Sequence, residues 1–392
     1  MKTILTMPLF LMLCAPALSQ ETATEKQIGE VAHKVVTNSA KIKPGDVVVI
    51  SGGKHTLPLL EALSTEAAKA GGRVAPILLS SDRVSRSLNT EVPEQYLGQP
   101  SPLIDWLKNV DVWISTPGVE DPQAVFTGVP DARLAKASKS ADLFRNALNQ
   151  SKIRSVEIAV PTRTDAELVQ VDFAKYQKML WDAINADYQQ IAAEGNKLKS
   201  ILARAKTVKV TSLSGTNFTF SVGNRPIFVN AGILKETAPG EPFLSRTASL
   251  PGGAVVFAPI ETSANGKVVA PRDVCRPYER LTGAAYEFRD GRMVSFKAEG
   301  NARCFEEYFA AYSGPKDMFS SFQIGLNPAL KVIEDGGDYR PPEAAGMVFI
   351  GIGNNDLLGG NNKTNFGWFI PVVNATVEVD GKIVVKDGQL VF

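Results

Sequence analysis

The side chains that usually carry out chemistry in proteins are scarce in this sequence of 392 residues. It has only two histidines, His33 and His55, and both lie in the N-terminal half. Zinc and iron sites of the common kinds use His and Cys ligands, so the C-terminal half has little material for one. A Ser-His-Asp triad would need one of these histidines, and the sequence contains no G-x-S-x-G segment.

The segment SGGKH (residues 51–55) follows an apolar run and precedes a helical pattern, which is where phosphate-binding loops occur. Its glycine spacing fits neither G-x-x-x-x-G-K-[ST] nor G-x-G-x-x-G. We interpret it as a strand-to-helix turn that needs glycine, with His55 as a candidate for the wall of a cleft. We expect His33 to be a surface or packing residue of the first helix.

A second segment, GMVFIGIGNNDLLGGNNKTNFGWFIPVV (residues 346–373), has the glycines and amides of a working loop. It contains no His or Cys, and its only acidic residue is Asp356. Its amides could bind a peptide or a small polar ligand, but such amides are also typical of simple turns. The candidate cleft-binding residues are Asn354, Asn355, Asn361, Asn362 and Lys363.

The first half of the chain alternates apolar strands with helical patterns. Residues 21–42 and 57–70 have apolar side chains at helical spacing, and the runs KPGDVVVISGG and GRVAPILLS read as buried strands. The runs DVWISTP and SVEIAVPT continue the alternation, which predicts a doubly wound parallel sheet covered on both faces. An apolar stripe predicts one long helix over residues 172–206.

After about residue 207, short strands and turn signals predominate. Arg-Asp-Gly, Val-Asp-Gly and Lys-Asp-Gly are typical hairpin corners, and a helix is expected near residues 304–312. We therefore expect an α/β chain with two parts. Residues 20–205 should form a doubly wound parallel-sheet domain, and residues 206–392 a β-rich domain.

The first 19 residues have the pattern of a secretory signal peptide. Lys2 precedes an apolar run over residues 4–14, and small residues follow it. Cleavage is expected after Ser19, with cleavage after Ala17 as the alternative. The apolar run is far shorter than the roughly 20 residues that span a bilayer, so the mature chain should have no membrane span. We expect an exported protein, either periplasmic or secreted.

The charge balance argues against a nucleic-acid partner, and the cysteine content raises the question of a disulfide. The chain has 42 basic and 41 acidic residues, and loss of residues 1–19 removes one Lys and no acid, so no basic surface for nucleic acid is implied. Loss of the same segment removes Cys14 and leaves Cys275 and Cys304. In an oxidising compartment these two could form a disulfide, or they could stay two separately buried thiols.

Three segments of the C-terminal half resemble the aminopeptidase T family, the thermophilic metalloaminopeptidases with their leucyl-aminopeptidase-like relatives. They are LPGGAVVFAPIETSANGKVV (250–269), FSSFQIGLNPA (319–329), and GMVFIGIGNN followed by GGNNKTNFGWF (346–355 and 359–369). The upstream half agrees in length and order, with GTNFTF (215–220) at the family's entry into its second domain. The resemblance implies the aminopeptidase T fold, and a homodimer as in the relatives.

Active members of this family hold a pair of divalent ions with two Glu, two His and one Asp. Matched residue by residue, the two Glu fall at Ala254 and Ser321, the two His at Phe349 and Gly367, and the Asp at Phe369. The resemblance therefore implies the family fold without its metal centre. No cofactor is expected, with a divalent metal such as zinc as the alternative. The rings of Phe349 and Phe369 are expected to fill the ion volume and to converge with the other three positions on one dry pocket.

Three functions remain open. The primary hypothesis is a non-catalytic protein that binds a ligand or assembles through the old cleft. The first alternative is a hydrolase or aminopeptidase with a relocated site, which would use acids such as Glu261, Asp273, Glu306 or Asp356. The second is suggested by a branch of the family similar to iron-dependent dioxygenases that open dihydroxypyridine rings. That branch also needs His ligands, so the same losses count against it.

Overall fold

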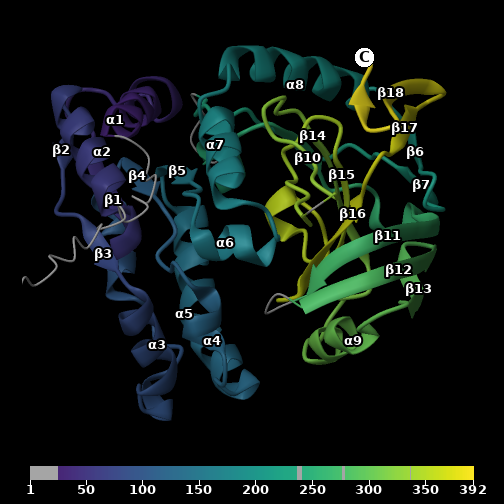
Figure 1. Ribbon diagram of the computed structural model, residues 1–392, viewed down its shortest axis with the longest axis horizontal. Coiled ribbons are helices and arrows are strands. Elements are labelled where there is room, and N and C mark those ends of the chain that lie inside the picture. The colour runs from purple at the N-terminus through teal and green to yellow at the C-terminus, as the bar shows by residue number, and fades with distance from the viewer. Residues whose placement is uncertain (1–24, 236–240, 276–278, 336) are drawn as a thin grey trace, which may run out of the picture.

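A computed structural model describes residues 25–235, 241–275, 279–335 and 337–392. An α/β lobe and a β-rich lobe lie side by side (Figure 1). This combination confirms the fold class expected from the sequence. The signal-peptide prediction for residues 1–19 lies outside the described residues.

The α/β lobe is built on an all-parallel sheet in the order β2-β1-β4-β5-β9, with β3 also paired to β1. Its strands are β1 (Val47–Gly53), β2 (Arg73–Val74), β3 (Leu78–Ser80), β4 (Val112–Ser115), β5 (Arg154–Ile158) and β9 (Thr247–Leu250). The helices of this lobe are α1 (Glu25–Lys34), α2 (Leu57–Lys69), α3 (Asp82–Thr90), α4 (Pro122–Phe126), α5 (Asp131–Gln150), α6 (Arg163–Leu168), α7 (Phe173–Ile184) and α8 (Tyr188–Leu202).

Helices cover both faces of this sheet, as continuous apolar strands require. Val48 and Ile50 of β1 pack in one core cluster with apolar residues of α1 and α2. Val49, between them in sequence, points to the other face and packs with Trp113 and residues of α5. The alternation along β1 thus places a hydrophobic layer on each side.

Two sequence predictions in this lobe were wrong in detail. The helix predicted over residues 172–206 is two helices, α7 and α8. Asp187 ends the continuity because its side chain accepts hydrogen bonds from two N–H groups at the start of α8. The strand predicted in GRVAPILLS is two short strands, β2 and β3, which are only partly buried, and Pro76 lies between them. Proline lacks the N–H that a sheet ladder needs.

The β-rich lobe contains two antiparallel sheets. The five-stranded sheet has the order β16-β15-β14-β10-β8, and the eight-stranded sheet has the order β13-β12-β11-β7-β6-β17-β18-β19. The five-stranded sheet comprises β8 (Ile227–Asn230), β10 (Ala254–Phe257), β14 (Phe319–Gly325), β15 (Val348–Gly353) and β16 (Gly367–Val372). The other comprises β6 (Thr207–Thr211), β7 (Asn217–Ser221), β11 (Asn265–Cys275), β12 (Glu279–Arg289), β13 (Arg292–Lys297), β17 (Thr376–Val379), β18 (Lys382–Lys386) and β19 (Gln389–Leu390), and the helix α9 (Ala302–Ala310) packs on β12.

The boundary predicted between residues 205 and 206 does not separate the two lobes cleanly. Strand β9 comes from the second half of the chain, yet it pairs in parallel with β5 and completes the α/β sheet. The chain therefore crosses from the β-rich lobe into the α/β lobe and returns within a few residues to begin β10. This crossing places Leu250 and Pro251 at the junction of the lobes.

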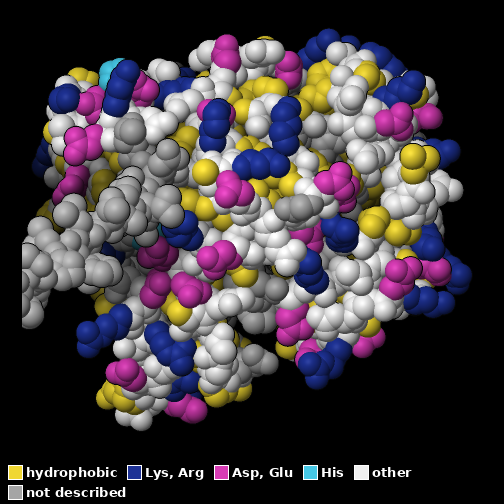
Figure 2. Space-filling model, viewed as in Figure 1, with side chains coloured by type: hydrophobic (Ala, Val, Ile, Leu, Met, Phe, Trp, Pro, Cys, Tyr) yellow, Lys and Arg dark blue, Asp and Glu magenta, His cyan; other side chains and the backbone are white. Residues whose placement is uncertain are grey.

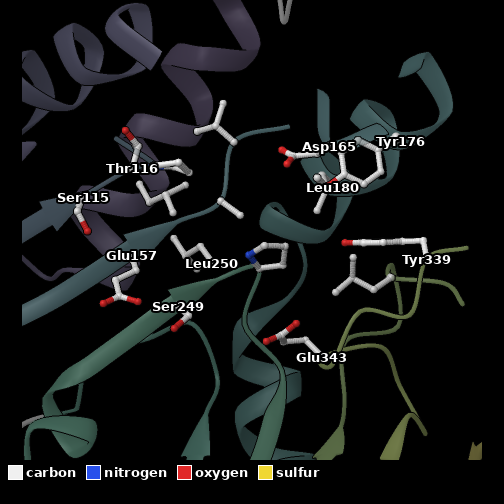
Figure 3. A pocket seen from close by; sticks show the side chains of 16 residues that line it. Ser115, Thr116, Glu157, Asp165, Tyr176, Leu180, Ser249, Leu250, Tyr339 and Glu343 are labelled. Atoms are coloured by element: carbon white, nitrogen blue, oxygen red, sulfur yellow. The ribbon is translucent and has the colours of Figure 1, made fainter. Parts of the chain in front are cut away.

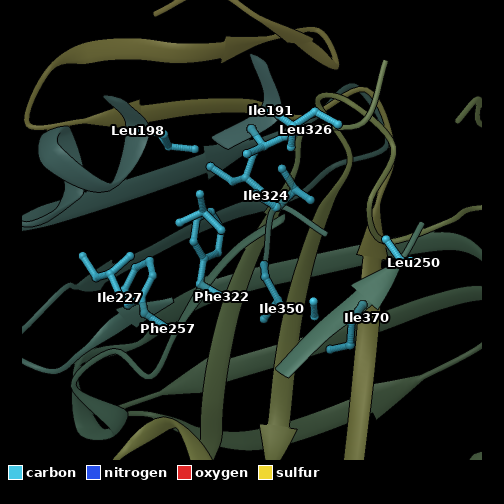
Figure 4. Packing of buried hydrophobic residues seen from close by; sticks show 14 of the residues in the cluster. Ile191, Leu198, Ile227, Leu250, Phe257, Phe322, Ile324, Leu326, Ile350 and Ile370 are labelled. Carbon is cyan, nitrogen blue, oxygen red and sulfur yellow. The ribbon is translucent and has the colours of Figure 1, made fainter. Parts of the chain in front are cut away.

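One face of the five-stranded sheet forms the main core of the second lobe. Phe322 and Ile324 of β14 and Ile350 of β15 point to this face, and Ile191 and Leu198 of α8 lie over it (Figure 4). Helix α8 comes so close to the sheet that a side chain at Gly195 would collide with Val229. The opposite face of the same sheet carries the five positions matched to the family's metal ligands.

Cys275 at the end of β11 and Cys304 in α9 form a disulfide, with their Cα atoms 5.9 Å apart. Phe305 beside it is buried and packs edge-on against Tyr286 of β12. The bond therefore ties a helix to the strand pair on which it rests.

Changing Cys275 and Cys304 together to Ser should lower the free energy of unfolding by about 3 kcal/mol, because the bond closes a loop with a sequence separation of 29 residues. Urea titrations of the oxidised wild type and the double variant measure the difference. A reduced wild type should match the variant. Equal stability of oxidised and reduced wild type would contradict the prediction.

Among the described helices, none has the length and apolar character needed to cross a bilayer. On the face shown in Figure 2, basic and acidic side chains are interspersed, in keeping with the formal net charge of +1.

Candidate functional site

The five positions matched to metal ligands share one face of the five-stranded sheet. The register pairs Ser321 with Gly351 and Gly351 with Phe369, so these positions form a row across β14, β15 and β16. Side chains on a strand alternate between the two faces of a sheet. The same register therefore places the remaining matched positions on this face. The five are Ala254, Ser321, Phe349, Gly367 and Phe369.

Their surroundings differ, and the expectation of a single dry pocket filled by two rings was wrong. Phe349 is buried and belongs to an apolar cluster with Tyr176 and Leu180 of α7. Phe369 is 57% exposed. A Cβ atom added at Gly367 would meet nothing within 4 Å. The difference arises because residues of α6 and α7 pack in the cluster around Phe349, whereas Phe369 near the start of β16 stays uncovered.

The residues at these positions do not fit a dinuclear metal centre. Ala, Phe and Gly side chains offer no donor atom, and a single Ser hydroxyl cannot replace several anionic ligands. In the described ranges, no three His, Cys, Asp or Glu side chains form a group that could hold a metal ion.

The Asn-rich loop between β15 and β16 is held together by internal hydrogen bonds, which favours turn chemistry over ligand contact for two of its candidate residues. The side-chain amide of Asn355 donates to Glu261 Oε1 at 3.0 Å and to the Ser320 carbonyl at 3.1 Å. The Asn362 amide donates to the Phe319 carbonyl at 3.0 Å. Asn355 and Asn362 are both buried, so neither amide is available to a ligand.

The remaining candidates of this loop are Asn354, Asn361 and Lys363. Asn354 Oδ1 accepts a hydrogen bond from the Asp356 N–H, a local turn contact. Asn361 and Lys363 are exposed. None of the five loop residues lines the cavity described below. Turn chemistry, which the sequence left open, therefore accounts for most of the loop.

Glu261 is the centre that organises this loop. Its carboxylate accepts hydrogen bonds from Arg225 at 2.7 Å and from the Asn361 N–H at 2.8 Å, besides the one from Asn355. Burial opposes ionisation of Glu261, but these donors outweigh it and lower its pKa to about 2. Glu261 is thus a structural anion. It is committed to Arg225 and the loop, and it is not a free catalytic acid.

The other acids considered for a relocated site do not line the cavity described below. Asp273 is buried in the β-rich lobe, whereas Glu306 and Asp356 are exposed. His55 also does not line the cavity, and burial lowers its pKa. His33 is mostly exposed and pairs with Glu66 at 2.8 Å, as a surface residue of α1.

A cavity of about 460 Å³ lies at the carboxyl ends of β4, β5 and β9, where they face the β-rich lobe. Its wall combines strand ends, residues of α6 and α7, and the segment that precedes β15 (Figure 3). The lining residues are Ser115, Thr116, Pro117, Glu157, Ile158, Ala159, Val160, Asp165, Tyr176, Leu180, Ser249, Leu250, Pro251, Leu330, Tyr339 and Glu343. Ligands of open α/β sheets bind at this edge.

Three carboxyl groups reach this cavity from three elements. Glu157 comes from β5, Asp165 from α6, and Glu343 from the segment before β15. Loss of contact with water raises the pKa of Asp165, and that of Glu343 to about 7, whereas Glu157 stays exposed, so the same effect on its pKa is screened by solvent. Asp165 is fixed by Thr162, whose hydroxyl donates to its carboxylate at 2.7 Å.

Two tyrosines also line the cavity. The rings of Tyr176 and Tyr339 meet edge to face, with their centroids 5.3 Å apart. Burial raises the pKa of both phenols, so both stay protonated and can donate hydrogen bonds. Figure 3 shows both rings beside Asp165 and Leu180.

Sequence reasoning missed this site. Glu157 and Glu343 are separated by much of the chain, and no motif connects them. The usable signal was positional, because SVEIAVPT was predicted as a parallel strand and polar residues near the carboxyl end of such a strand are candidates for a ligand site.

Comparisons with known proteins agree with the fold. The profile of the thermophilic metalloprotease (M29) family matches residues 24–318. The matched span ends just before β14. Among the five matched ligand positions, all but Ala254 lie beyond that span.

Two similar proteins illustrate the range of the fold. The structure of AmpT from Thermus thermophilus superposes with a TM-score of 0.74 at 15% identity, covering 94% of this chain and 100% of that one. The structure of 2,5-dihydroxypyridine dioxygenase from Pseudomonas putida gives a TM-score of 0.60 at 16% identity, covering 94% and 98%.

In sequence, the chain is 26% identical over 207 residues to 2,5-dihydroxypyridine 5,6-dioxygenase of Pseudomonas putida. That match covers 49% of this chain and 56% of the relative, so the chain spans little more than half of the relative's length. The profile match covers most of the chain, and the likeness of fold runs nearly from end to end. The chain belongs to the thermophilic metalloprotease (M29) family.

Proposed function

We propose that this family member has lost the dinuclear metal site and acts as an exported, non-catalytic protein that binds a small polar ligand or the end of a peptide. One observation carries the proposal. The register sets the five ligand-matched positions on one face of the sheet, and none of them has a carboxylate or an imidazole. The cavity between the lobes is where we place the ligand.

Metal binding at this face is unfavourable because the anionic ligands that two cations need are missing. Two dications held close together repel each other, and anionic ligands must offset that repulsion. Here the covered part of the face holds Phe349 within an apolar cluster. Burying a cation there without anionic partners would cost far more free energy than the remaining Ser321 hydroxyl could return.

The cavity suits reversible binding. Its volume of about 460 Å³ falls within the usual range for small-molecule sites. It mixes apolar side chains with a few polar groups, which gives both burial and orientation. We also propose export, on the basis of the N-terminal segment 1–19, and the Cys275–Cys304 disulfide is the kind of bond an oxidising compartment allows.

A second candidate is a hydrolase with a relocated site, and one observation favours it. Glu343 lines the cavity and has a pKa raised to about 7. Carboxyl groups with a pKa near neutrality can serve as general acids or bases. In that case the reaction would need no metal and would depend on Glu343.

After incubation with zinc, cobalt or manganese and dialysis, the protein should retain less than about one metal ion per ten chains, since the matched positions supply no anionic ligands. It should also show no chelator-sensitive hydrolysis of aminoacyl substrates. Elemental analysis and a chromogenic peptidase assay measure these, with a zinc metalloprotease carried through the same dialysis as the control.

The outcomes separate the candidates. Stoichiometric metal with chelator-sensitive turnover would contradict the proposal. Turnover that persists with chelator but disappears in Glu343→Gln would favour the relocated hydrolase. Retention of turnover in that variant would exclude both the relocated site at Glu343 and a non-catalytic protein.

A further inference from the structure

We infer that the cavity between the lobes recognises an organic ammonium group attached to a small apolar body. This inference rests on the proposed ligand binding at the cavity and names its chemical class. The observations are the charges that reach the cavity, the lack of internal partners for two of them, and the apolar and aromatic part of the wall.

The charges of the wall all have one sign. Its ionisable groups are Glu157, Asp165 and Glu343, together with the two phenols. No Lys, Arg or His is among the residues that line it. The carboxyl groups come from β5, α6 and the segment before β15, so their side chains surround the space and do not follow one element (Figure 3).

Two of these carboxyl groups lack a partner that could stabilise them inside the protein. The side-chain carboxylate of Glu343 accepts a hydrogen bond from its own backbone N–H, and within the described chain neither Glu343 nor Glu157 forms an ion pair. Glu261 shows the contrast, because that buried carboxylate has Arg225 and two amide donors. The chain thus gives Glu261, a buried acid with a structural role, a cationic partner, but it leaves Glu157 and Glu343 without one, whereas Asp165 feels the charge of His55.

A ligand cation would supply the missing charge. Enclosure raises the pKa of Glu343 because water no longer solvates the carboxylate well, whereas Glu157 lines the cavity but stays exposed to solvent. An ammonium group in the cavity would favour the ionised carboxylate and donate hydrogen bonds to it. Such charge-assisted hydrogen bonds are worth about 1.5–3 kcal/mol, or roughly 10- to 150-fold in affinity.

The apolar and aromatic residues of the wall indicate what the ammonium group should be attached to. Leu180, Leu250 and Leu330 present aliphatic surface, and Tyr176 and Tyr339 add aromatic surface that also attracts cations. The cavity therefore suits a compact amine with a hydrocarbon or aromatic tail. A highly charged polyamine or an anion would bury charge against this apolar part without compensation.

Titration calorimetry with three compounds of matched shape tests the inference: phenethylamine, 2-phenylethanol and 3-phenylpropionate. At about pH 8 the amine should bind at least about tenfold more tightly than the alcohol and the acid, because only the amine pairs with the carboxylates. Glu157→Gln and Glu343→Gln should each weaken amine binding about tenfold and leave the alcohol unchanged. The matched control is Glu306→Gln, an exposed acid on α9, which should have no effect.

Affinity should also depend on pH in a defined direction. As pH falls from about 8 to about 6, Glu343 takes up a proton near its pKa of about 7, so amine binding should weaken, and Glu343→Gln should largely lose this dependence. Circular dichroism shows whether each variant folds. If Glu343→Gln does not fold, the affinity of Glu157→Gln for the amine tests the inference.

The inference is overturned if the amine fails to bind at about 10 mM, if the alcohol binds equally well, or if neither Gln variant weakens amine binding. Binding of the alcohol or the acid without the amine would leave the cavity as a ligand site and reject only the ammonium class. The metal and turnover measurements test the proposed function independently of this result.

Discussion

Replacing Asp273 with Asn is expected to make the protein progressively more stable than the wild type as pH rises, by up to about 4 kcal/mol between pH 4 and pH 8. Burial raises the pKa of Asp273 from 3.8 to about 7 in the folded protein. A raised folded pKa means that the neutral acid is favoured on folding. This contribution to stability is therefore complete below about pH 4 and is lost as pH rises through 7.

The surroundings of Asp273 explain the size of the shift. One carboxylate oxygen accepts from the Val274 N–H at 2.8 Å, and the other is buried without a hydrogen-bond partner in the described part of the chain. The charge of Arg340 lowers the pKa, but Arg340 also pairs with Asp338, whose own charge raises it. Ionised Asp273 is thus poorly compensated, and a neutral amide of the same shape removes the cost.

Urea titrations of the wild type and Asp273→Asn at pH 4, 6 and 8 measure the effect as a difference that grows with pH. Glu343, whose pKa is also near 7, contributes equally to both proteins and cancels. Glu306→Gln, at an exposed position, is the control and should run parallel to the wild type. Parallel curves for Asp273→Asn would show that Asp273 titrates normally.

Replacing Glu261 with Gln should lower the free energy of unfolding by about 3 kcal/mol, because it leaves the half-buried Arg225 guanidinium without its anion. The same change weakens the hydrogen bonds that hold Asn355 and the Asn361 N–H. We therefore expect the loop between β15 and β16 to open more readily than the strands that flank it.

Denaturant titration and amide hydrogen exchange over residues 354–362 measure the two effects. The matched control is Asp317→Asn, which breaks the exposed ion pair with Arg292 and should cost at most about 1 kcal/mol. The depressed pKa of Glu261 means that its contribution persists above about pH 4.5 and is lost only as pH falls toward 2. Equal costs for Glu261→Gln and Asp317→Asn at pH 7 would contradict the structural role of Glu261.

Much of the fold could be predicted because local patterns and the fold agree. The apolar run of β1 and the helical spacing after it were enough to predict a parallel sheet with helices on both faces. The hairpin corners after residue 207 likewise indicated antiparallel sheets. The errors came where a single residue overrode the pattern, as Asp187 does between α7 and α8 and Pro76 does between β2 and β3.

The candidate site was predicted less well, because its contacts join residues that lie far apart in the sequence. The Asn-rich loop looked like a binding surface, but only the tertiary structure brings Glu261 beside Asn355, nearly a hundred residues away. Once Glu261 and Arg225 are in place, the amides of the loop are used inside the protein. The sequence contains the same residues in either case and cannot show which partner each amide finds.

The sequence by itself determined which donor atoms the family's metal face can offer, because no fold can place an imidazole or a carboxylate at Ala254, Phe349 or Gly367. It also determined the alternation of strands and helices, since side-chain periodicity acts over a few residues. The tertiary structure alone decided that Phe349 is buried while Phe369 is exposed, and that Glu157 and Glu343 face one cavity. Burial and pKa depend on what packs around a side chain, and those neighbours come from distant parts of the chain.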